Sequence, residues 1–352
     1  MSELVLMKGN EAIAETAIKV GCRQYYGYPI TPQNEIAEYM AKRMPQVNGL
    51  SLQAESEIAA INMVLGASAT GARVLTSSSS PGISLKTEGI SYLVGSDLPC
   101  VIANIQRGGP GLGGIQPAQS DYNQATKALG HGDMKIIVLA PNSIQEMVDF
   151  TALAFDLSDI YRMPAMILAD GALGQMMEPV AFDKIVSREL PEKTWATDGH
   201  EHKREPNLIN SLYIAPEDLE DTVIERFKKY EKIEADEVMY EEYDIEDSDI
   251  VLVSYGIASR IVKSVAEECR KNGIKAGYFR PISLYPFPSK RLSEIADMTK
   301  EFMVIELNMG QMINDVKLAT QSKKEVHFFG RTGGVIFTPR EVTEAVLNRK
   351  NK

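Results

Sequence analysis

Cys100-Val-Ile-Ala-Asn-Ile-Gln106 is an almost continuous apolar stretch that ends at Arg107 and the glycine-rich segment 108–114. A half-exposed strand would alternate polar and apolar residues, so this run predicts a β-strand covered on both faces. Similar runs predict further strands at 24–26, 50–53, 73–77, 135–139 and 165–169. Between them, apolar residues spaced by three and four predict helices such as 57–67, 83–94 and 144–160. This alternation predicts an α/β fold with a doubly wound parallel sheet.

The strand and helix pattern stops in the middle of the chain and then resumes. Residues 192–206 are polar and residues 241–249 are strongly acidic, which indicates an excursion and linker with one helix near 216–230. A second α/β unit begins at Ile250-Val-Leu-Val-Ser-Tyr-Gly256, and its last helix opens with the capping box Thr338-Pro-Arg-Glu341. We therefore expect a first domain over residues 1–182, an excursion over 183–248 and a smaller second domain over 249–352.

Composition excludes several classes of function. The 352 residues are 44% hydrophobic and carry a net charge of -11, which argues against a nucleic-acid-binding surface. The three cysteines are scattered without a C-x-x-C pair, so we expect neither a zinc site nor an iron–sulfur cluster on this chain. No apolar stretch is long enough to cross a membrane and the N-terminus has no signal-peptide pattern, so we expect a cytoplasmic protein that does not bind membranes.

The segment Gly27-Tyr-Pro-Ile-Thr-Pro32 lies between an expected strand and an expected helix over 33–44. Thr31 is expected as the N-cap of that helix, with Pro32 at its first position. The simplest interpretation is a plain helix start. A carboxylate site can exist there as well, because a helix N-terminus beside a hydroxyl attracts small anions.

The segment Gln53-Ala-Glu-Ser-Glu57 marks another strand-to-helix junction. Glu57 precedes Ala60, Ile61 and Val64 at helical spacing, so its side chain should lie on the apolar stripe of the helix. An apolar setting favours the protonated carboxyl, which can share a proton with a bound base. The alternative is a carboxylate that only complements the helix dipole, and that interpretation suits Glu55, which falls on a different face.

Two further junctions carry polar residues. Ser77-Ser-Ser-Ser-Pro-Gly82 is either a polar turn or a phosphate cradle, and it lacks the lysine of a nucleotide-binding P-loop. Arg107 should face the crevice at the carboxyl ends of the strands, where its planar guanidinium suits a carboxylate. A surface ion pair is the alternative for Arg107. The four histidines form no hydrolytic triad that the sequence supports.

Taken together, these motifs resemble those of the 2-oxo acid:ferredoxin oxidoreductases. The resemblance also includes Gln116-Pro-Ala-Gln-Ser-Asp-Tyr122 and Asp170-Gly-Ala-Leu-Gly-Gln175, and it is strong from Met7 to about Pro179 and looser over 250–352. The chain is most similar to the pyrimidine-binding, alpha-type subunit of the branched-chain (3-methyl-2-oxobutanoate) enzyme, with the corresponding 2-oxoglutarate subunit second. This implies a thiamine-enzyme pyrimidine-binding domain followed by a smaller transketolase-C-terminal-like domain.

The resemblance also implies cofactors and partners. Thiamine diphosphate would be shared with a beta-type subunit that binds its diphosphate through magnesium and carries a [4Fe–4S] cluster. Gamma-type and ferredoxin-like subunits would complete the complex, and this chain would hold no metal itself. The implied reaction is oxidative decarboxylation of a 2-oxo acid to an acyl-CoA, with coenzyme A as co-substrate and ferredoxin as the electron acceptor.

Carried over residue by residue, the resemblance gives Glu57 the role of the catalytic acid that hydrogen-bonds N1′ of the cofactor's aminopyrimidine. Thr31 and Arg107 would hold the oxygen atoms of the substrate, and Pro29 and Ser80 would line the pyrimidine pocket. Two alternatives are a subunit of a lipoamide-linked 2-oxo acid dehydrogenase and a non-catalytic scaffold of a similar complex. A scaffold would not need Glu57, Thr31 and Arg107 together, which argues against it.

Overall fold

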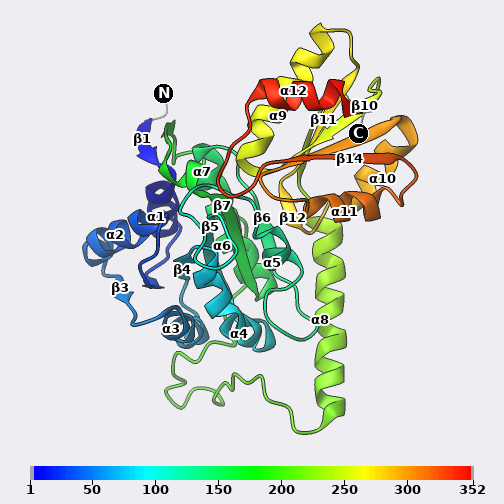
Figure 1. The fold of residues 1–352 in the computed structure, drawn as a ribbon. Coiled ribbons are helices and arrows are strands. Elements are labelled where there is room, and N and C mark those ends of the chain that lie inside the picture. The colour runs from blue at the N-terminus through cyan, green and yellow to red at the C-terminus, as the bar shows by residue number, and fades with distance from the viewer. Residues whose placement is uncertain (1–3, 350–352) are drawn as a thin grey trace.

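The computed structural model describes residues 4–349, so the outer ends of the two expected domains, 1–3 and 350–352, lie outside the described residues. Figure 1 shows two α/β units, the first in blue to green and the second in yellow to red. The first is built on a seven-stranded sheet in the order β12-β6-β7-β5-β4-β2-β3. Its strands are β2 (Gln24–Gly27), β3 (Leu50–Gln53), β4 (Val74–Ser78), β5 (Cys100–Gln106), β6 (Ile137–Leu139), β7 (Pro164–Asp170) and β12 (Ser283–Tyr285).

The predicted strands of the first half form the parallel part of this sheet. All neighbours from β6 to β3 pair parallel, and only β12 pairs antiparallel, with β6. Every residue of β5 and β7 is buried, as their continuous apolar sequences predict. The chain steps from β2 outward to β3 and then crosses back to β4, so the strand order reverses between β2 and β4. Ligands bind in open α/β sheets at such a reversal, beyond the carboxyl ends of the strands.

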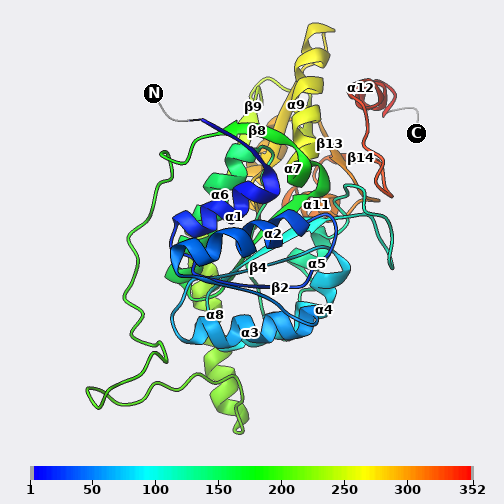
Figure 2. The same cartoon turned by 90° about the vertical axis from the view of Figure 1, so that its left-hand side faces the viewer.

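Helices cover both faces of this sheet. Figure 2 shows α3 and α4 on the opposite side of the strands from α1. The helices of the first unit are α1 (Gly9–Lys19), α2 (Asn34–Arg43), a 3-10 helix (Met44–Val47), α3 (Glu57–Ala69), α4 (Pro81–Gly95), α5 (Tyr122–Thr126), α6 (Ile144–Tyr161) and α7 (Gly171–Gln175). The doubly wound arrangement predicted from the sequence is confirmed.

The second unit has a five-stranded sheet in the order β14-β13-β10-β11-β9. Its strands are β9 (Tyr240–Tyr243), β10 (Ile250–Val253), β11 (Ala276–Pro281), β13 (Glu301–Glu306) and β14 (Glu325–Gly330), and its helices are α9 (Gly256–Lys271), α10 (Ser289–Met298), α11 (Met312–Ala319) and α12 (Pro339–Leu347). α12 begins with the predicted capping box, in which Thr338 and Glu341 bond each other's backbone N–H groups. A separate antiparallel pair joins β1 (Val5–Lys8) to β8 (Met177–Val180).

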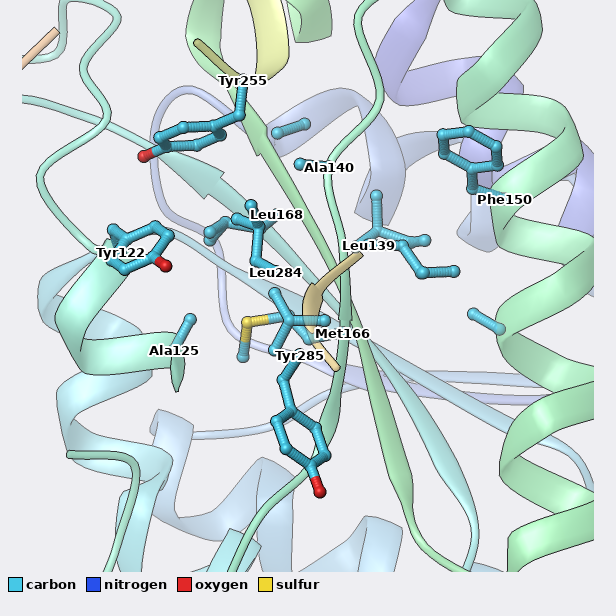
Figure 3. Packing of buried hydrophobic residues seen from close by; sticks show 14 of the residues in the cluster. Tyr122, Ala125, Leu139, Ala140, Phe150, Met166, Leu168, Tyr255, Leu284 and Tyr285 are labelled. Atoms are coloured by element: carbon cyan, nitrogen blue, oxygen red, sulfur yellow. The ribbon is translucent and has the colours of Figure 1, made fainter. Parts of the chain in front are cut away.

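The two units share one core. β12 lies beyond residue 249 in the sequence yet completes the first sheet, whereas β9 lies within the excursion yet joins the second sheet. The buried apolar residues of both units form one continuous cluster. Figure 3 shows part of it, where Leu284 and Tyr285 of β12 pack beside Leu139 and Met166 of the first unit. The expected domain boundaries stay predictions.

The excursion follows the surface of the first unit before it forms a long helix. Residues 181–215 contain no helix or strand and run along one side of the unit (Figure 2). Two ion pairs attach this segment, Arg188 to Glu237 at 2.6 Å and Lys193 to Asp159 at 2.6 Å. The helix predicted near 216–230 is confirmed as α8 (Pro216–Asp236) and extends six residues further. No helix within residues 4–349 is both long and apolar enough to cross a membrane.

The prediction that Thr31 caps α2 is wrong. α2 begins at Asn34, with Gln33 at the N-cap position, so Thr31 and Pro32 belong to the preceding loop. The Gln33 side chain is fully buried, where its amide donates to the carbonyl of Tyr28 at 3.2 Å and its oxygen accepts from the Ser77 hydroxyl at 2.5 Å. This contact with the end of β4 keeps the loop non-helical through residue 33 and overrides the local capping signal.

Candidate active site at the carboxyl edge of the sheet

Four segments meet at the point where the strand order reverses. The carboxyl ends of β2, β4 and β5 are adjacent in the sheet. β2 is followed by the loop 28–33, β4 by the turn at Ser79 and Ser80, and β5 by Arg107. The junction between β3 and α3 adds Glu57 at the first position of α3. The predicted site residues therefore come from neighbouring loops of one sheet edge.

Glu57 is buried at the start of α3, with a relative exposure of 5%. Ser56 caps the helix by accepting a hydrogen bond from the backbone N–H of Ala59 at 3.1 Å, which sets the direction in which the first turn points. Within residues 4–349 no group donates a hydrogen bond to the Glu57 carboxyl, whereas Glu55 is exposed. The predicted placement of Glu57 on the buried stripe of α3 is confirmed, and its carboxyl is left available for a ligand.

Gly82 in the first turn of α4 makes room for this carboxyl. A β-carbon on Gly82 would lie 2.6 Å from Glu57 Oε1 and 2.1 Å from Ser78 Oγ, both closer than van der Waals contact permits. Ser78 Oγ is itself buried and has no hydrogen-bond partner among the described residues. The Glu57 carboxyl and the Ser78 hydroxyl thus lie beside Gly82. Together they can donate hydrogen bonds to a planar base and accept hydrogen bonds from it.

Lys86 lies one turn further along α4 and is completely buried. Its ammonium donates to Thr76 Oγ1 at 2.5 Å and to the Ser77 carbonyl at 3.1 Å. Burial lowers the pKa of Lys86 to about 7, against the opposing effect of the Glu57 carboxylate. Lys86 is not among the site residues predicted from the sequence, although its spacing from Ile83 and Ile90 places it on the apolar stripe of the helix.

Arg107 and Thr31 are in direct contact. Arg107 is 9% exposed, and its guanidinium donates to the carbonyl of Thr31 at 2.9 Å and to that of Leu112 at 3.3 Å. Its Nε atom is buried without a hydrogen-bond partner among the described residues. The Thr31 hydroxyl accepts a hydrogen bond from Asn34 at 3.3 Å and keeps its own proton for a further acceptor.

Ser80 connects the turn after β4 to the end of β5. Its hydroxyl donates to Asp121 at 2.7 Å and accepts from the backbone N–H of Arg107 at 3.0 Å, while Asn104 donates to the same carboxylate oxygen at 3.0 Å. Burial raises the pKa of the Asp121 carboxyl. Ser80 and Asp121 also line a cavity of about 620 Å³ to which Leu112 and Met309 contribute, so both α/β units form its walls.

The structure thus joins four of the five predicted site residues to one sheet edge. Arg107 contacts both Thr31 and Ser80, and Glu57 faces the turn after β4 through Gly82. The fifth, Pro29, is exposed in the loop 28–33. The roles of all five residues stay predictions, and Asp121, Gly82 and Lys86 are site residues that the sequence analysis did not assign.

Comparison with known proteins places the chain in a family. Residues 15–245 match the family described as pyruvate flavodoxin/ferredoxin oxidoreductase, thiamine diphosphate-binding, and residues 248–342 match core domain II of pyruvate:ferredoxin oxidoreductase. The chain belongs to the pyruvate flavodoxin/ferredoxin oxidoreductase family. The resemblance predicted from the motifs is confirmed.

Curated relatives match the chain over nearly its whole length. It is 47% identical over 341 residues to the ketoisovalerate oxidoreductase subunit VorB of Methanothermobacter marburgensis, covering 97% of this chain and 96% of the relative. It is 37% identical over 366 residues to the 2-oxoglutarate synthase subunit KorA of Methanocaldococcus jannaschii, covering 97% and 98%. Both relatives are named as subunits.

Solved structures support the same fold. The 2-oxoglutarate:ferredoxin oxidoreductase from Magnetococcus marinus, with 2-oxoglutarate, coenzyme A and succinyl-CoA bound, matches with a TM-score of 0.87 and 25% identity. That match covers 99% of this chain, which spans 65% of the longer protein. A split-gene transketolase, 15% identical with a TM-score of 0.60 over 97% of each chain, shares the fold. The predicted combination of a thiamine-enzyme domain and a second α/β domain is confirmed.

Proposed function

We propose that this chain is the alpha-type, pyrimidine-side subunit of a 2-oxo acid:ferredoxin oxidoreductase that acts on 3-methyl-2-oxobutanoate (ketoisovalerate). The buried, unpaired carboxyl of Glu57 against Gly82 is the observation that carries the proposal, because it offers an acid where a planar base can approach. The higher identity to the ketoisovalerate subunit, 47% against 37% for the 2-oxoglutarate subunit, supports the branched-chain substrate.

The residues at this edge fit the pyrimidine half of thiamine diphosphate. When bound, thiamine diphosphate supplies the electron sink that lets a 2-oxo acid lose carbon dioxide. Glu57 holds a proton at N1′ of the pyrimidine, and its burial strengthens that hydrogen bond because water does not compete. Ser78 adds a donor and acceptor beside it. Ser80, whose hydroxyl donates to Asp121 at 2.7 Å, lines the neighbouring cavity of about 620 Å³, and Pro29 would line the pyrimidine pocket from the loop 28–33.

Arg107 and Thr31 bind the carboxylate and keto oxygens of the substrate. The Arg107 guanidinium is fixed by two backbone carbonyls, so little side-chain entropy is lost when it binds an anion. Its buried Nε has no hydrogen-bond partner among the described residues, so it has a hydrogen to donate to an anion. The Thr31 hydroxyl supplies a neutral donor beside this charge.

Partner subunits complete the enzyme. The three cysteines are free, buried and far apart in the sequence, which supports a [4Fe–4S] cluster on a beta-type subunit. The same subunit would hold the magnesium that anchors the diphosphate, as the family resemblance implies. Gamma-type and ferredoxin-like subunits carry the electrons to ferredoxin, and coenzyme A accepts the acyl group. The exposure of Pro29 and of Leu112 (86%) beside the site is consistent with a subunit covering this edge.

The substrate assignment is tested on the purified complex with a panel of 2-oxo acids and viologen reduction as the readout. Because pocket contacts to one or two methylenes are worth about 1–3 kcal/mol, we expect kcat/KM for 3-methyl-2-oxobutanoate to exceed that for pyruvate and 2-oxoglutarate by about tenfold or more. A complex that prefers 2-oxoglutarate would instead support the 2-oxoglutarate enzyme. A complex that oxidises none of the panel would support the scaffold alternative.

A further inference from the structure

Another cavity, of about 640 Å³, lies between α8 and the first unit, and Figure 1 shows α8 beside that unit. Asp97 lines the cavity from the turn before β5, and Arg162 lines it from the turn before β7. Arg226 and Lys229 of α8 form the opposite wall. Because the candidate active site occupies the carboxyl ends of the parallel strands, this α8 cavity lies at the other edge of the sheet and takes no part in the chemistry proposed above.

Arg226 is a buried arginine whose hydrogen-bonding capacity the protein does not fill. Its side chain is 7% exposed, and its Nη2 donates to the carbonyl of Gly95 at 3.2 Å. Its Nε has no partner among the described residues, and its ion pair with Asp97 is long, 3.7 Å. A buried guanidinium ordinarily has close charged partners, because removing its charge from water is costly. Arg226 therefore has donors available for a ligand.

Arg162 presents a second guanidinium to the α8 cavity. The group lies over the ring of Trp195, 4.6 Å from its centroid, and its Nε donates to the backbone carbonyl of Asp97 at 3.2 Å. Within residues 4–349, neither terminal nitrogen of Arg162 donates a hydrogen bond to the protein, and the residue forms no ion pair. The ring and the Nε bond thus fix the plane of the guanidinium and leave its terminal nitrogens free, an arrangement that suits an oxyanion.

Positive charge exceeds negative charge around the α8 cavity. Four cations line it: Arg162, Arg226, Lys229 and Lys232. Of the three acids in the lining, Asp221 is exposed, Glu225 is paired with Lys228 at 2.5 Å, and Asp97 is shared between Lys229 at 2.6 Å and Arg226. Burial lowers the pKa of Lys229, and the neighbouring Arg226 and Arg162 act in the same direction. A bound anion would relieve this local excess of positive charge on a chain whose net charge is -11.

We propose that the α8 cavity binds a small molecule through a phosphate group, which is held by Arg162, Arg226 and Lys229. A phosphate group has three terminal oxygens and a charge of about -1.5 to -2, so it matches two guanidinium groups and one ammonium better than a carboxylate does. A volume of about 640 Å³ leaves room for a phosphate monoester as well as for the free ion. The bound group would link the end of α6 to α8, beside Trp195 of the excursion.

The test titrates the purified full chain with sodium phosphate at neutral pH and constant ionic strength. Trp195 is the only tryptophan of the chain and contacts Arg162, so its fluorescence reports on the site, and calorimetry gives Kd independently. We expect saturable binding of one phosphate per chain. A second titration uses adenosine monophosphate: tighter binding than that of phosphate would identify an ester as the ligand, and equal or weaker binding would identify the free ion.

Arg162→Gln is the decisive variant, because Arg162 is half-buried and forms no ion pair among the described residues whose loss would destabilise the fold. We expect the Kd for phosphate to rise about tenfold or more, since hydrogen bonds to charged groups are the strong ones. Lys229→Met should have a similar effect and replaces this variant if Arg162→Gln does not fold. The matched control is Lys228→Gln, which removes the same charge from an exposed position of α8 and should change Kd less than about twofold.

Two results would overturn the proposal. A titration of the wild-type chain that does not saturate would mean that the α8 cavity holds no phosphate site. Equal weakening by Arg162→Gln and Lys228→Gln would mean that phosphate is attracted only by the general positive charge of α8. Because Glu57 and the α8 cavity lie at opposite edges of the sheet, either result leaves the proposed function untouched.

Discussion

A single glycine determines how closely the Glu57 carboxyl approaches α4. Gly82 has no β-carbon, and the space that the β-carbon would take is occupied by Glu57 Oε1 and Ser78 Oγ. Ile83 and Ile90 continue the packing of α4 beyond this point, and a second close approach to α3 occurs at Gly89, where a β-carbon would lie 2.4 Å from Ile61. The site therefore depends on the absence of a β-carbon at Gly82 as much as on the carboxyl of Glu57.

Replacing Gly82 with alanine should therefore displace the carboxyl. The added β-carbon forces the Glu57 carboxyl and the Ser78 hydroxyl to shift, so we expect thiamine diphosphate to bind at least about tenfold more weakly, corresponding to about 1.4 kcal/mol. The matched control is Gly66→Ala in α3, where no atom lies within 4 Å of the added β-carbon and helix propensity favours alanine by about 0.5–1 kcal/mol. Equal cofactor affinity in Gly82→Ala and the wild type, measured by calorimetry, would contradict this account.

At the scale of the element, the strands and most helices could be predicted from local sequence. β5 and β7 are mostly apolar and buried along their whole length, and α12 carries its own capping box, so their type follows from neighbours in the chain. The start of α2 could not be predicted, because a side chain from β4 binds Gln33 and outweighs the T-P capping signal. The role of Gly82 could not be predicted either, since it arises from the contact between α3 and α4.

The path of the excursion depends on a buried group of charges. Arg73 bonds Asp156 at 2.6 Å and Asp159 at 2.8 Å, and these two carboxylates also bind the backbone N–H of Arg188 and the ammonium of Lys193. Asp156 and Asp159 are 2% and 5% exposed, so the charges are largely removed from water. The excursion is thus attached to α6 through acids whose own charge is balanced by Arg73.

Arg73→Leu should loosen this attachment. Removing one partner of a buried ion pair leaves an uncompensated charge and costs about 3–5 kcal/mol. We expect the free energy of unfolding in urea to fall by about this amount, and limited proteolysis to cut faster between residues 189 and 210. Lys203→Ala, which removes an exposed ion pair with Glu201, is the control and should change neither measurement appreciably. Wild-type stability in Arg73→Leu would show that the charge group is not needed.

At the scale of the whole molecule, Gln119 makes several of the hydrogen bonds that join the two α/β units, beside others such as those of Tyr122 and Lys127 to Asp315. The Gln119 side chain donates to the carbonyl of Tyr255 at 2.7 Å and accepts from the backbone N–H of Leu307 at 3.1 Å. Its backbone carbonyl accepts from the Tyr255 hydroxyl at 3.0 Å and from Asn308 at 2.7 Å. Because Gln119 is two residues from Asp121, the interface between the units and the wall of the cavity are parts of the same loop.

Gln119→Ala should weaken the coupling between the units. The change leaves a buried carbonyl and a buried N–H without partners, each at a cost of about 1–3 kcal/mol. We expect calorimetry to show a lower Tm than the wild type, with the second unit unfolding first or the single transition broadening. Gln124→Ala, which removes one bond to the partly exposed Ser84, should unfold like the wild type. An unaltered transition in Gln119→Ala would mean that the shared apolar core and the other polar contacts join the units without Gln119.

Contacts between segments that are far apart in the sequence could not be predicted from it. Nothing local in residues 283–285 indicates that they complete the first sheet, because the partner strand β6 lies more than 140 residues earlier. The motifs still indicated the site, since the loops that carry Thr31, Glu57, Ser80 and Arg107 follow strands that any doubly wound sheet brings to one edge.

The proposed function requires that the buried acid Glu57 activates a thiamine cofactor. The most direct measurement is viologen reduction driven by 3-methyl-2-oxobutanoate in the assembled complex carrying Glu57→Gln, beside the control Glu55→Gln, which changes an exposed acid two residues away. We predict that Glu57→Gln assembles normally and loses at least about 99% of its activity, since general acid–base catalysis contributes about 10²–10⁴-fold, and that Glu55→Gln keeps wild-type activity. Full activity in an assembled Glu57→Gln complex would contradict the account.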